Sequence, residues 1–106
     1  MQWIMCHETN SAKRRGYIFL VDATDGITPE LGEAGGQPQI SKNGAGFVNT
    51  GGTLVSVGNG AYYVQFQQSE VSDRGWLLLR YKSVNTAEFQ SLIHIIAQTR
   101  FGDRML

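Results

Sequence analysis

Cysteine, histidine and serine are the residues of this sequence that could act as nucleophiles, bases or metal ligands. Cys6 is the only cysteine and stands beside His7, but neighbouring side chains of a strand point to opposite faces, so the two do not readily share a metal ion. His94 lies between two isoleucines, which is typical of a strand residue. None of the serines has the Gly-x-Ser-x-Gly surroundings of a catalytic elbow. We predict a protein that is not an enzyme and holds no metal and no cofactor.

Four carboxylates fall within twelve residues, at Asp22, Asp25, Glu30 and Glu33. Clustered oxygen ligands suit calcium, so a cation site is one interpretation of this segment. The spacing differs from that of an EF-hand loop, and aspartates close to Gly26 are typical of Asx turns. We favour turn-forming aspartates and solvated glutamates.

Aromatic side chains offer a second kind of chemistry, because an exposed aromatic platform can stack on sugar rings. The candidates are Trp76, Tyr81, Tyr62, Tyr63 and Tyr17. Aromatic residues of a small sandwich are usually part of its core, so we favour a core role and expect Trp76→Ala to unfold the protein. A carbohydrate-binding module stays open as the alternative.

The chain that positions these residues has 106 residues, enough for one domain with a modest core. Nine acidic and nine basic residues cancel, which argues against a general nucleic-acid or membrane-surface binder. A single cysteine forms no internal disulfide, and the apolar stretch at residues 1–6 is far shorter than a signal-peptide core or a membrane span. We therefore expect a protein made in a reducing cytosol.

Thirteen glycines and two prolines divide the sequence into short apolar runs, spaced as in an all-β sandwich. We expect about seven strands in an immunoglobulin-like β-sandwich, with a tight hairpin at Asn43 and Gly44 and an irregular crossing between sheets at residues 26–38. Residues 67–74 suit a single helical turn capped by Ser69. The expected strands are residues 17–21, 39–42, 46–48, 53–57, 61–66 and 76–81, while 89–97 suits either a strand or a short helix.

The two ends mix isolated apolar residues with charges, and we interpret them as arms. The predicted division is an N-terminal arm at 1–15, a β-sandwich domain at 16–97 and a C-terminal arm at 98–106. Net charge is +2 over residues 1–15, −5 over 16–73 and +3 over 74–106. This distribution would fit the arm of one copy onto the body of another, and solvated surface charge is the open alternative. The predicted partner-binding residues are Trp3, Ile4, Lys13, Arg14, Arg15, Phe101, Arg104 and Leu106.

The order of the turn motifs over residues 15–97 resembles a family of small β-sandwich domains in tailed-bacteriophage structural proteins. The motifs are DATDG with TPELG at residues 22–32, ISKNG at 40–44, GNGAYY at 58–63 and GWLLL at 75–79. The family usually has a bulky aromatic residue where this chain has Ala61, so the resemblance does not extend to a ligand platform at that turn.

The resemblance implies a non-enzymatic virion part, either a capsid decoration or cement subunit or, as the alternative, a tail, baseplate or fibre-associated module that binds a carbohydrate receptor. It also implies that the chain forms a homo-oligomer and binds the major capsid protein or other virion subunits, with no nucleic acid and no membrane as partners. The expected location is the virion, assembled in the cytoplasm of the bacterial host.

Overall fold

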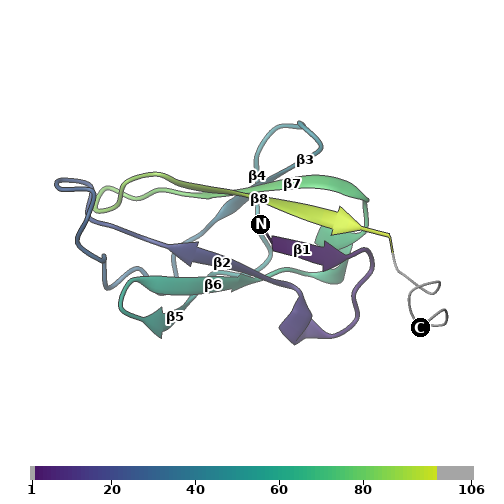
Figure 1. The fold of residues 1–106 in the computed structure, drawn as a ribbon, viewed down its shortest axis with the longest axis horizontal. Coiled ribbons are helices and arrows are strands. Elements are labelled where there is room, and N and C mark those ends of the chain that lie inside the picture. Colours follow the sequence, from purple (N-terminus) through teal and green to yellow (C-terminus); the bar gives the residue numbers. More distant parts are fainter. Residues whose placement is uncertain (1, 98–106) are drawn as a thin grey trace.

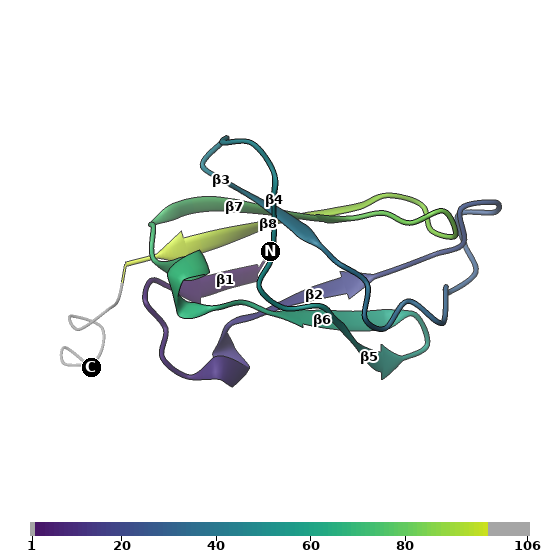
Figure 2. The same cartoon turned by 180° about the vertical axis from the view of Figure 1, so that it is seen from behind.

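The computed structural model describes residues 2–97 and places them in two β-sheets that face each other (Figures 1 and 2). Two short 3-10 helices, η1 and η2, are its only helical elements in this part of the chain. The elements in chain order are β1 (Gln2–Met5), η1 (Ser11–Lys13), β2 (Arg15–Phe19), β3 (Gln39–Lys42), β4 (Val48–Asn49), β5 (Leu54–Gly58), β6 (Ala61–Gln65), η2 (Gln68–Val71), β7 (Gly75–Tyr81) and β8 (Phe89–Ile96). The prediction of an all-β sandwich is confirmed.

One sheet has five strands in the order β1-β8-β7-β3-β4, and the other has three in the order β2-β6-β5. Neighbouring strands are antiparallel except β1 and β8, which are parallel. The irregular connection after β2 leads from the three-stranded sheet to the five-stranded one, as the two prolines and the glycines of residues 26–38 predict.

Alternating side chains build the core between the sheets, because successive residues of a strand point to opposite faces. Tyr62, Val64 and Phe66 alternate along and just after β6 and are all buried, and Leu77 and Leu79 of β7 face them from the other sheet. The sheets come close at Gly16, where a Cβ atom would lie 2.8 Å from Leu79 and from Phe66. Position 16 therefore requires glycine, which has no Cβ atom.

The predicted Asn43-Gly44 hairpin is confirmed. Both residues have positive φ, 50° and 85°, and the Ala45 N–H donates to the Lys42 carbonyl across the turn. The strand that returns from it, β4, has only two residues and begins later than the predicted 46–48. Residues 68–71 form the expected helical turn, but Gln67 rather than Ser69 caps it, with the Gln67 N–H donating to the Glu70 carboxylate at 2.7 Å.

Residues 89–97, left open between helix and strand, form a strand through Ile96. β8 pairs with β7 on one side and β1 on the other, and both pairings bury Ile93 and Ile95 in the core. Strand partners on both edges of residues 93–95 satisfy the backbone groups of the most buried part of β8, so this part of the run needs no helix to do so.

The prediction of an N-terminal arm at 1–15 is wrong for the described residues of that segment. Gln2–Met5 form the edge strand β1, with Ile4 and Cys6 in the core. The Gln2 side chain points inward and donates to the Arg15 carbonyl of β2, so the segment ties the two sheets together. Four residues with one inward isoleucine are too few for a periodic pattern to stand out. The predicted C-terminal arm, 98–106, lies outside the described residues.

Candidate binding surface

Among residues 2–97, the residues predicted to bind partners do not share one exposed face. Trp3 is 60% exposed on the outer side of β1, whereas Ile4 next to it is 2% exposed and packs in the core. Ile4 is therefore not an anchor for a partner, because its side chain faces the opposite sheet. Phe101, Arg104 and Leu106 lie outside the residues that the structure describes.

The three consecutive bases predicted to bind a partner have separate roles. The Arg14 guanidinium donates to three backbone carbonyls, those of Glu8, Thr9 and Phe66, at 2.9 to 3.0 Å, and so fixes the loop before β2 to the end of β6. The Arg15 guanidinium lies over the Tyr63 ring, 4.2 Å from its centroid. Lys13 is exposed on η1. Arg14 is thus a structural residue rather than a binding one.

Aromatic side chains cross three strands on the outer face of the five-stranded sheet. The strand register places Trp3 of β1 beside His94 of β8, and His94 beside Trp76 of β7. The rings of His94 and Trp76 stack with centroids 4.4 Å apart and planes inclined by 20°. We call Trp3, His94 and Trp76 the aromatic row.

Trp76 is 42% exposed, so the expectation that it is a core residue is wrong. Leu77 and Leu79 point inward, and strand alternation then directs Trp76 outward. The run from Trp76 to Leu79 is continuously apolar, so the sequence alone does not show which of its side chains point outward. The row makes the outer face a surface with large exposed apolar rings.

Further apolar and basic groups continue the outer face beyond the aromatic row. Leu92 of β8 is exposed and lies opposite Leu78 of β7. At the far side of the sheet the Arg80 guanidinium lies over the Phe47 ring, 3.8 Å from its centroid, and donates to the Gln39 side-chain oxygen at 2.8 Å. A surface of this kind, with rings and aliphatic groups rimmed by polar side chains, is typical of an interaction site.

A groove runs beside the aromatic row, between β1 of one sheet and β2 of the other. Its volume is about 320 Å³. We call it the edge groove. Residues from β1, the following loop, η1 and β2 line it, namely Gln2, Trp3, Ile4, Met5, Glu8, Ala12, Lys13, Arg15 and Tyr17. Four of the predicted binding residues, Trp3, Ile4, Lys13 and Arg15, therefore line this groove, although the Ile4 side chain is itself buried.

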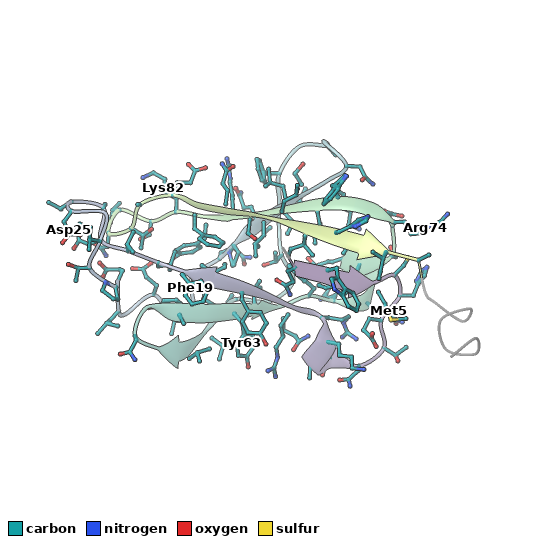
Figure 3. The ribbon with its side chains drawn as sticks, viewed as in Figure 1. Met5, Phe19, Asp25, Tyr63, Arg74 and Lys82 are labelled. Atoms are coloured by element: carbon teal, nitrogen blue, oxygen red, sulfur yellow. The ribbon has the colours of Figure 1, made fainter. Side chains whose placement is uncertain are left out.

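The outer face of the three-stranded sheet also carries exposed rings. Tyr17 and Tyr63 lie opposite each other on β2 and β6, with ring centroids 6.2 Å apart, and Phe19 is 66% exposed (Figure 3). Both sides of the sandwich thus present aromatic side chains to the surroundings.

Of the clustered carboxylates, Asp22 and Asp25 form turns, as we favoured, but Glu33 is buried, so the expectation of a solvated glutamate is wrong there. Asp25 accepts hydrogen bonds from the Thr28 hydroxyl and from the backbone N–H groups of Ile27 and Thr28, which lower its pKa to about 2. Asp22 accepts the N–H of Thr24 in the same loop. Within residues 2–97, no group of three histidine, cysteine, aspartate or glutamate side chains could hold a metal ion.

Glu33 differs from the other carboxylates in being buried. Its Oε1 accepts the Tyr81 hydroxyl at 2.6 Å. Burial, together with this hydrogen bond and the charge of Glu33, raises the pKa of Tyr81 to about 12. The pair attaches the long β2–β3 connection to the end of β7.

Cys6 and His94, two further candidates for chemistry, lie in packing contacts instead. The Cys6 thiol is buried and donates to the Ser72 carbonyl at 3.1 Å, whereas His7 beside it is exposed. His94 lies in the aromatic row rather than beside a nucleophile. No helix among residues 2–97 is long and apolar enough to span a membrane.

Comparisons of the chain with protein-family models, with curated proteins and with solved structures find no match. The exposed surface and the sequence motifs are therefore the basis for assigning a function.

Proposed function

We infer that the sandwich is of the immunoglobulin type. In that fold, strands B, E and D form one sheet and strands G, F and C the other, with C′ added next to C in variable-type domains. The orders β2-β6-β5 and β8-β7-β3-β4 follow this arrangement when β2 is taken as strand B. The inter-sheet disulfide of antibody domains has no equivalent, because Ile18 and Leu79 fill the core of strands β2 and β7.

We propose that the protein is a non-enzymatic structural subunit of a bacteriophage virion, a capsid decoration or cement protein that binds neighbouring virion subunits. The observation that carries the proposal is the aromatic row, three aromatic residues at neighbouring register positions on the outer face of the five-stranded sheet, two of which stack on each other. Interfaces are enriched in tryptophan and tyrosine at their centres. The phage-like order of turn motifs supports the virion as the setting.

The partners in this proposal are the major capsid protein or other virion subunits, and further copies of the chain itself. The location is the virion, assembled in the bacterial cytoplasm. Residues 98–106, with Phe101, Arg104 and Leu106, are a second proposed contact.

A carbohydrate-binding module of the tail, baseplate or fibre is the second candidate, and the exposure of Trp3 and Trp76 favours it. A sugar stacks on the open face of an aromatic ring. One face of the Trp76 indole is already against His94, which leaves less open ring surface for a sugar than a free platform has. This geometry favours a protein partner over a glycan.

Two measurements test the proposal. Mass spectrometry of purified phage particles, produced by the genome that encodes the chain, should find it at a fixed copy number relative to the major capsid protein. Particles made with Trp3→Ser and Trp76→Ser together should contain far less of the chain, while the soluble double variant keeps its β-type circular dichroism.

Val57→Ser is the matched control, because Val57 is 62% exposed on β5, in the other sheet. It should leave incorporation into particles unchanged. Absence of the wild-type chain from particles would refute the proposal, and retention of the wild-type chain on a glycan array, lost in the tryptophan variant, would favour the carbohydrate-binding alternative.

A further inference from the structure

One end of the sandwich is strongly acidic although the whole chain is neutral. Three connections meet at this end, residues 20–38, 58–60 and 82–88, and backbone hydrogen bonds join them, such as those from Leu20 to Gly60 and from Ala23 to Asn85 (Figure 1). We call it the acidic end. Five carboxylates and one ammonium group give it a net charge of −4, and they are Asp22, Asp25, Glu30, Glu33, Glu88 and Lys82. The rest of the chain, with four acidic and eight basic residues, has a net charge of +4.

The acidic end also carries aliphatic side chains that are among the most exposed of the molecule. Ile27 is 79% exposed and Val84 is 94% exposed, on two loops that hydrogen bonds join. Leu31 is 64% exposed on the same connection as Ile27. Aliphatic groups surrounded by carboxylates suit a partner surface that is apolar inside and basic at its rim.

The edge groove is such a surface, with apolar walls and basic side chains at its rim. Its walls include Trp3, Met5 and Tyr17, and its volume of about 320 Å³ lies at the lower end of the range of binding clefts. Lys13 and Arg15 border it, against one carboxylate, that of Glu8, which already accepts the Asn10 N–H at 3.1 Å. The charged side chains of the groove therefore sum to +1.

Within one copy, the acidic end and the edge groove do not contact each other. Asp25 marks the acidic end at one extremity of the molecule, while Met5 of the groove lies in the opposite half (Figure 3). We propose that the acidic end of one copy docks into the edge groove of a second copy, with Ile27 as the apolar anchor and Lys13 and Arg15 facing the carboxylates.

Such a contact joins different surfaces of the two copies, so it is heterologous and generates a ring or a filament rather than a closed two-fold dimer. The inference deepens the proposed function, on which it rests, by naming the two surfaces through which copies meet. The edge groove shares only Trp3 with the aromatic row, so His94 and Trp76 stay free for another virion subunit.

The test uses two variants, each damaged on one side of the contact. Ala12→Glu with Lys13→Glu makes the groove acidic, and both residues are exposed on η1. Glu30→Lys with Glu88→Lys brings the acidic end from −4 to zero net charge. Ala45→Glu with Arg74→Glu is the matched control, because it makes the same charge change as the groove variant at exposed positions that do not line the groove.

Sedimentation velocity at low ionic strength and at about 0.3 M salt measures the association, since salt screens exposed charges. The wild-type chain and the control should form dimers and larger species that dissociate as salt rises, while each groove or acidic-end variant stays monomeric. An equimolar mixture of the two variants should form a one-to-one dimer only, because one intact end and one intact groove remain.

Two results would overturn the inference. Self-association of the groove variant equal to that of the wild type would show that the groove is not the contact, and a monomeric wild type at low salt would show that there is none. If the chain is nevertheless present in purified particles, the proposed function stands and only the contact between copies is refuted.

Discussion

Two adjacent residues of β1, Trp3 and Ile4, give opposite predictions for stability. Ile4 is 2% exposed and packs between the sheets, while Trp3 is 60% exposed on the outer face. Truncating a buried isoleucine to alanine costs about 2 to 5 kcal/mol, because apolar contacts are lost and a cavity remains. Truncating an exposed strand residue costs less than about 1 kcal/mol.

These figures are large for a domain whose free energy of unfolding is expected to be about 5 to 15 kcal/mol. With a urea dependence of roughly 1.5 kcal/mol per molar, Ile4→Ala should lower the unfolding midpoint by roughly 1 to 3 M. Trp3→Ala should lower it by less than about 0.7 M. Ile4→Val is the conservative control, with an expected cost of about 0.5 to 1.5 kcal/mol.

Urea unfolding followed by far-ultraviolet circular dichroism measures all three variants against the wild type. A midpoint for Ile4→Ala within about 0.3 M of that for Trp3→Ala would contradict the account. It would mean that β1 is not docked in solution and that the N-terminal segment is an arm after all.

Three other changes have definite expected results. Tyr81→Phe removes the hydroxyl from the buried Glu33 carboxylate and should cost about 1 to 3 kcal/mol at neutral pH. Unfolded tyrosine ionises near pH 10 and the folded Tyr81 near 12, so wild-type stability should fall across this interval by on the order of 2 kcal/mol more than that of the variant, in urea melts at each pH. Gly36→Ala places a Cβ atom against the Tyr81 ring and should lower the melting temperature by several degrees, with Gly46→Ala, where the space is open, as the control. Trp76→Ser should leave the fold intact, and a disordered spectrum for this variant would place Trp76 in the core.

The body of the sandwich could be predicted because its strands repeat a pattern several times. Val64 and Leu79 belong to alternating or continuous apolar runs, and Asn43 with Gly44 is a strong hairpin signal. These features depend on local sequence alone. When these strands pair in the folded protein, their boundaries differ from the predicted ones by no more than a few residues.

The edge strand could not be predicted in the same way. β1 has four residues, and what makes it a strand is the free edge of β8, more than 85 positions later in the chain. The parallel pairing of Ile4 with Ile95 leaves no local signature in the sequence. The candidate surface could not be predicted for the same reason. Trp3, His94 and Trp76 are neighbours only because β1, β8 and β7 pair in this order.

The most direct test of the account is oxidative footprinting of Trp3 and Trp76 in the free subunit and in purified particles, read by mass spectrometry. Both indoles are exposed in the subunit, 60% and 42%, and both should label readily there. If the outer face of the five-stranded sheet binds a neighbouring subunit, labelling of both should fall several-fold in the particle while Val57 keeps its label. If each tryptophan were labelled to the same extent in the free subunit and in the particle, the central claim would be contradicted.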